Sequence, residues 1–92
     1  MTELFIDVSP IEGGPPGAYR VNLVGYRAGA SPRIERITDG DLLQRLETVL
    51  QWPHPTIERL RHELRTENRL KRERLESVTT DQLRELGFDL PD

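Results

Sequence analysis

Residues 57–76, with the sequence IERLRHELRTENRLKRERLE, combine a very high charge density with regularly spaced apolar residues. Twelve of these twenty residues are charged, seven of them basic and five acidic. Ile57, Leu60 and Leu64 are separated by three and four positions, which is the spacing of one face of an α-helix. The pattern predicts a long charged helix over residues 57–78, with a seam along one side.

The predicted seam changes character in its middle, where Asn68 and Lys71 occupy the positions between Leu64 and Leu75. A polar residue in a helical seam can fix the register and the number of paired helices, at a cost in stability. We therefore expect the helix to dock on a protein partner or on a second copy of itself, as a homodimer. The alternative is that the seam packs inside its own domain and the charges form an ordinary solvated face.

Basic residues follow one flank of the predicted helix, and acidic residues follow the other. The predicted partner-binding residues are Leu60, Arg61, Leu64, Arg65, Asn68, Arg69, Lys71, Arg72 and Leu75. Their charges would steer a partner and set its register. The competing interpretation is a nucleic-acid-binding regulator, in which Arg61, Arg65, Arg69 and Arg72 meet phosphates. Nearby glutamates weaken this interpretation, and the helix offers no aromatic residue on which a base could stack.

The first part of the chain alternates apolar and polar residues with a period of two. Leu4, Ile6 and Val8 alternate in this way and predict a strand with one buried face, and residues 19–24 repeat the pattern. The glycines and prolines of residues 13–17, GGPPG, predict the loop of a hairpin between them. A third strand is expected at residues 33–37, although its two isoleucines are three positions apart instead of two.

Two further helices have recognisable ends. Thr38 followed by Asp41 resembles a capping box, and it precedes a helical set of apolar residues, Leu42, Leu43, Leu46, Val49 and Leu50. Prolines at 53 and 55 end this helix and start the next. Thr79 and Gln82 form a second capping-box pattern, and Gly87 suits the end of a short helix over residues 80–86.

These elements predict a single α+β domain over residues 1–92. Residues 1–37 would form an antiparallel β-hairpin or a three-stranded meander, and residues 38–92 would form three helices. Ninety-two residues suit one small domain. A free edge of the expected sheet is a second surface on which a partner strand could add.

The chain has few motifs of the kinds that catalyse reactions or bind metals. The chain has no cysteine, and its two histidines, His54 and His62, do not have the spacing of a zinc site. The loop at residues 13–17 lacks the lysine of a phosphate-binding loop. We therefore expect no catalytic residues, no metal and no cofactor, and an enzymatic or small-ligand domain is the third interpretation. The net charge of −3 argues against general binding of polyanions.

The chain has no apolar run near the roughly 20 residues that span a bilayer, and no membrane association is expected. A cytoplasmic location agrees with the absence of cysteine. The sequence therefore favours a small non-enzymatic protein-interaction module that acts as an adaptor, inhibitor or regulator.

Overall fold

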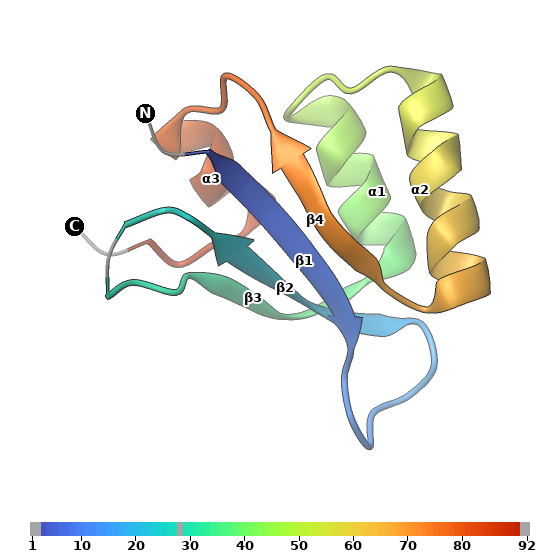
Figure 1. Cartoon of the computed structure of the whole chain (residues 1–92). Coiled ribbons are helices and arrows are strands. Elements are labelled where there is room, and N and C mark those ends of the chain that lie inside the picture. The colour runs from blue at the N-terminus through green and yellow to red at the C-terminus, as the bar shows by residue number, and fades with distance from the viewer. Residues whose placement is uncertain (1–2, 28, 91–92) are drawn as a thin grey trace.

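The computed structural model describes residues 3–27 and 29–90, which form one antiparallel sheet and three helices (Figure 1). The strands are β1 (Leu4–Pro10), β2 (Ala18–Val24), β3 (Arg33–Thr38) and β4 (Leu70–Leu75). The helices are α1 (Asp39–Thr48), α2 (His54–Glu67) and α3 (Thr80–Leu86). The sheet order is β3-β2-β1-β4, so the last strand of the chain lies beside the first. The predicted α+β class is confirmed, but the sheet has a fourth strand that was not predicted.

The predicted hairpin is present, with β1 and β2 paired from Phe5 opposite Val24 to Pro10 opposite Tyr19. The third predicted strand is also present, and it contains a β-bulge. Tyr19 lies opposite Ile37 and Val21 lies opposite Ile34, so two residues of β3 face the single residue Arg20. The extra residue brings both isoleucines to the buried side of the sheet, which explains their spacing of three.

The prediction of a continuous helix over residues 57–78 is wrong. α2 ends at Glu67, and Asn68 adopts the left-handed conformation with φ 59°. The chain then reverses and runs along β1 as β4. A continuous helix would have placed Asn68 and Lys71 in its apolar seam, whereas in the folded chain both are exposed. Pairing with β1 buries Leu70 and Leu75 without burying these polar side chains.

The turn after α2 is held from a distant part of the sheet. The Tyr19 hydroxyl on β2 donates a hydrogen bond to Oδ1 of Asn68 at 2.9 Å. The Asn68 amide donates to the Leu64 carbonyl at 3.0 Å and closes the last turn of α2. Asparagine enters the left-handed region more readily than most residues, so the turn needs no glycine.

Both predicted N-cap threonines stand at helix starts, but only the second one forms a complete capping box. The Thr38 hydroxyl accepts a hydrogen bond from the Asp41 amide at 3.2 Å, and α1 begins at the next residue. Thr79 and Gln82 cap α3 reciprocally. α3 ends at Leu86 and is capped by Gly87, whose φ of 116° is one that side-chain-bearing residues rarely adopt.

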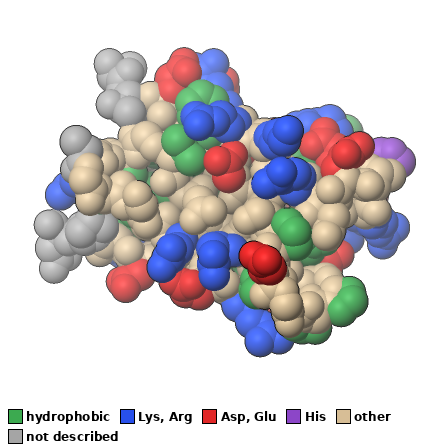
Figure 2. Space-filling view, turned by 60° about the horizontal axis from the view of Figure 1, so that its bottom comes forward, with side chains coloured by type: hydrophobic (Ala, Val, Ile, Leu, Met, Phe, Trp, Pro, Cys, Tyr) green, Lys and Arg blue, Asp and Glu red, His purple; other side chains and the backbone are tan. Residues whose placement is uncertain are grey.

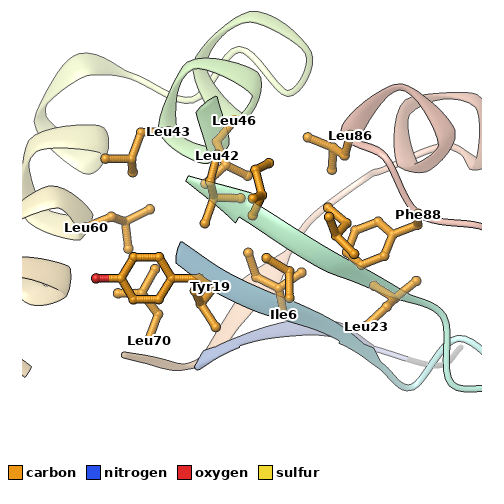
Figure 3. Close-up of a cluster of buried hydrophobic side chains, with 14 of the residues drawn as sticks. Ile6, Tyr19, Leu23, Leu42, Leu43, Leu46, Leu60, Leu70, Leu86 and Phe88 are labelled. Carbon is orange, nitrogen blue, oxygen red and sulfur yellow. The ribbon is translucent and has the colours of Figure 1, made fainter. Parts of the chain in front are cut away.

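The core lies between the helices and one face of the sheet. Figure 3 shows leucines of α1, α2 and α3 pointing toward the inward side chains of the strands. The labelled residues of this cluster are Ile6, Tyr19, Leu23, Leu42, Leu43, Leu46, Leu60, Leu70, Leu86 and Phe88. None of the helices in residues 3–27 and 29–90 combines the length and apolar character required to cross a bilayer.

Substitutions at Asn68 distinguish a left-handed turn at this residue from a continuous helix. Asn68→Gly and Asn68→Ala both lose the hydrogen bond from Tyr19, but only alanine pays the steric cost of the left-handed conformation. We expect the alanine variant to be less stable than the glycine variant by about 1 kcal/mol in urea unfolding. In a continuous helix the order would reverse, because alanine is there about 1 kcal/mol better than glycine.

The stability of the fold should depend on pH through Tyr19. Burial raises the pKa of its phenol, and the negative charge of Asp39 raises it further. The unfolded chain loses this proton near pH 10, while the folded chain still holds it. The free energy of unfolding should therefore fall as pH rises above about 10, through the folded pKa.

Urea unfolding between about pH 8 and about pH 11 measures this fall, with Tyr19→Phe as the control that cannot ionise there. The wild-type protein should lose more stability across this interval than the phenylalanine variant. An equal loss in both proteins would show that Tyr19 does not contribute.

Candidate functional site

One face of the sheet is left uncovered by the helices, and it carries polar side chains at the alternate positions of its strands. Asp7 and Ser9 on β1 and Asn22 on β2 are half-buried there. Together with the start of β4 they surround a depression of about 450 Å³. We call this depression the basic hollow; its polar lining consists of Asp7, Ser9, Asn22, Arg69, Lys71 and Arg72.

A second β-bulge builds the rim of the basic hollow. Val8 lies opposite Leu70 and Ile6 lies opposite Glu73, so Lys71 and Arg72 both face Asp7. In a regular strand these two neighbours would point to opposite faces of the sheet. Because of the bulge, both line the same hollow on the uncovered face.

Asp7 fixes the bulge through the main chain. Its Oδ1 accepts a hydrogen bond from the Arg72 amide at 2.6 Å. Arg72 has φ 43°, which is strained for a residue with a side chain. Next to it, Glu73 points toward α2, where Arg59 bonds to both of its carboxylate oxygens at 3.2 and 3.3 Å. The hydrogen bond to Glu73 is also the main cause of the raised pKa of Arg59.

The basic side chains of the hollow differ from most others in lacking partners. Arg20, Arg33, Arg59, Arg61 and Arg74 form ion pairs with glutamates. Within the described part of the chain, the side chains of Arg69, Lys71 and Arg72 form no hydrogen bond or ion pair, and Arg36 and Arg65 share this property. Arg27 also has no hydrogen bond or ion pair, but its guanidinium lies 5.5 Å from the centroid of the Tyr26 ring. Four of these six cations fall between residues 65 and 72, so the free positive charge is concentrated at the end of α2 and the start of β4.

A second depression, of about 440 Å³, adjoins the first and has the opposite charge. We call it the acidic hollow; it is lined by Pro10, Glu12, Glu67 and Asn68, and it shares Ser9 and Arg69 with the basic hollow. The carboxylates of Glu12 and Glu67 have no ion-pair partner among residues 3–27 and 29–90. The two hollows together form a groove with a positive and a negative part.

The surface around this region offers charge more than apolar area. Figure 2 shows basic and acidic side chains interspersed, with hydrophobic side chains in small separate groups on the face in view. Binding of a partner at such a surface depends on complementary charges and hydrogen bonds more than on burial of a large apolar patch.

The structure divides the predicted partner-binding residues into three sets. Leu60, Leu64 and Leu75 have exposed fractions of 0, 2 and 5% and belong to the core of the domain. Arg61 and Arg65 lie on α2, where Arg61 pairs with Glu58 at 3.5 Å. The remaining four, Asn68, Arg69, Lys71 and Arg72, come together at the turn and bulge and line the groove.

The other half of the groove was missed in the sequence. Asp7, Ser9 and Asn22 are the polar members of alternating strands, and this alternation marked them as facing away from the core. No feature of the sequence near these residues indicated that β4 would lie beside them.

The groove can bind charged groups of both signs. Among the described residues, no group of three or more histidine, cysteine, aspartate or glutamate side chains could hold a metal ion. Comparisons with protein-family models, with curated proteins and with solved structures found no match to this chain. Its function is therefore inferred from the groove.

The hydrogen bond from the Arg72 amide to Asp7 should hold the bulge in place. Asp7→Ala removes the acceptor, whereas Asp7→Asn keeps an acceptor oxygen of nearly the same shape. We expect the alanine variant to lose about 1 kcal/mol of stability and the asparagine variant to lose less. Hydrogen exchange at the Arg72 amide should accelerate most in the alanine variant. Equal exchange rates in the three proteins would show that Asp7 does not hold the bulge.

Proposed function

We propose that this protein is a small non-enzymatic protein-interaction module, serving as an adaptor, inhibitor or regulator, that docks a segment of a partner polypeptide in its groove. The observation that carries the proposal is the concentration of unpaired charge around the groove. Arg69, Lys71 and Arg72 line the basic hollow, and Glu12 and Glu67 line the acidic hollow beside Arg69. Charges that satisfy no partner within the domain are available to a partner outside it.

The outer face of α2 is less suited to docking than the sequence indicated. Leu60 and Leu64 are buried in the domain's own core, so α2 presents no apolar seam on which a second helix could pack. Self-pairing through this helix is therefore not part of the proposal. The basic hollow instead lies on the uncovered face of the sheet, where the strands provide a rigid support for its side chains, and the acidic hollow adjoins it at the β1–β2 loop and the end of α2.

Nucleic acid is the second candidate, because three unpaired cations lie together at the basic hollow. Two observations favour a polypeptide over it. The four arginines at 61, 65, 69 and 72 no longer share one helical flank, since Arg69 and Arg72 lie beyond the end of α2. Glu12 and Glu67 adjoin the hollow and would repel a chain that carries a negative charge at every nucleotide.

Affinity capture from cells that naturally contain the protein tests the proposal with two matched variants. Arg69→Glu with Lys71→Glu reverses two charges at the groove, and Arg61→Glu with Arg65→Glu makes the same change in charge on α2. We expect a partner protein that the wild type and the α2 variant retain and that the groove variant loses.

Other outcomes of the capture experiment are equally informative. Loss of the partner only from the α2 variant would contradict the groove and favour the helix. Retention by both variants would exclude both surfaces. Captured material that depends on nucleic acid, and that nuclease removes, would favour the second candidate.

A further inference from the structure

We infer that the basic hollow binds a phosphoryl group carried by the partner polypeptide, and that the acidic hollow binds a basic side chain next to it. This inference rests on the proposed function, since it names the chemistry of the segment that the groove takes. Three features support it: the charge of the basic hollow, the arrangement of its hydrogen-bond donors and the opposite charge of the acidic hollow.

The charge of the basic hollow suits a dianion. Arg69, Lys71 and Arg72 contribute three positive charges and Asp7 contributes one negative charge, which leaves two positive charges. A phosphorylated serine, threonine or tyrosine carries about −1.5 to −2 at neutral pH, whereas an acidic side chain carries a single charge. Asp7 is already bonded to the Arg72 amide, so part of its charge is directed into the bulge.

The donors of the hollow come from more than one direction. Guanidinium and ammonium groups lie along the rim on β4 and the preceding turn, while the Ser9 hydroxyl and the Asn22 amide lie on β1 and β2. Within the described residues, the side chains of Ser9 and Asn22 form no hydrogen bond. A phosphoryl group has three terminal oxygens that accept hydrogen bonds in different directions, and guanidinium groups bind it in a bidentate manner.

The acidic hollow favours a polypeptide over a nucleic acid or a membrane as the carrier of the phosphoryl group. Glu12 comes from the loop between β1 and β2, and Glu67 is the last residue of α2. Both lie beside Ser9 and Arg69, which the two hollows share. A nucleic acid or an anionic membrane presents negative charge to both hollows, and the acidic one repels it. A polypeptide can place a lysine or arginine beside its phosphorylated residue and match both hollows.

Titration with defined peptides tests the inference. The probe is a capped glycine and alanine peptide with one lysine followed by one phosphoserine. Its matched controls carry unmodified serine or glutamate in place of the phosphoserine, or glutamate in place of the lysine. Amide chemical shifts of the isotopically labelled protein give both the affinity and the location of binding. We expect the phosphopeptide to bind at least about tenfold more tightly than each control. The largest shifts should fall at Ser9, Asn22, Lys71 and Arg72.

Variants of the protein assign each half of the groove. Arg69→Gln with Lys71→Gln should abolish the preference for phosphoserine, and Glu12→Gln with Glu67→Gln should abolish only the preference for the neighbouring lysine. Arg72→Asn removes the cation, and asparagine accepts the left-handed backbone at this position. A loss of binding in this variant therefore reports the loss of the Arg72 charge and not a change in the bulge. Arg36→Gln removes an unpaired cation outside the groove and should leave binding unchanged.

Several results would overturn the inference. They are equal affinity for phosphorylated and unmodified peptides, binding that the Arg69 and Lys71 variant retains, or no peptide binding at all. The proposed function has a separate test, because a groove-dependent partner that is still captured after phosphatase treatment of the lysate would uphold docking and reject the phosphoryl group. Binding of a single-stranded oligonucleotide or of anionic vesicles in place of the peptides would assign the hollow to that ligand.

Discussion

The left-handed turn at Asn68 determines the form of the last third of the chain. The Tyr19 hydroxyl holds the Asn68 side chain at 2.9 Å, and α2 ends one residue earlier. The chain can therefore reverse and place β4 against β1, which buries Leu70 and Leu75 in the common core. Without this reversal β1 would be an edge of the sheet, and the polar residues after α2 would have to occupy a helical seam.

The two β-bulges give this small sheet its pattern of surface charge. Each edge strand carries one, and each places two charged residues opposite a single residue of its neighbour. Bulges and charged side chains on edge strands also discourage the addition of further strands. In β4 the bulge has a second consequence, because it brings Lys71 and Arg72 together above Asp7 at the rim of the groove. The backbone geometry of one edge strand thus connects the fold to the proposed binding of a charged polypeptide.

The hairpin, α1 and α3 could be predicted from the sequence because local features determine them, namely alternation, prolines and capping boxes. β4 could not be predicted, because its bulge breaks the period of two. Leu70 and Glu73 both face the helices although they are three positions apart. This spacing resembles that of a helix, and the segment comes directly after the real helix α2. The same irregularity weakened the prediction of β3. The rim residues Asn68, Arg69, Lys71 and Arg72 were identified from their charge and polarity, whereas Asp7, Ser9 and Asn22 join them only through the pairing of β1 with β4.

After Asn68 the chain forms a bulged strand that pairs with β1, and this pairing forms the basic hollow of the groove. Nuclear Overhauser contacts between backbone protons measure it most directly. We predict cross-strand contacts between Leu4 and Leu75 and between Phe5 and Arg74, with helical contacts that stop at Asn68. A continuous series of helical contacts between residues three apart, running from α2 through to Val78, would contradict it.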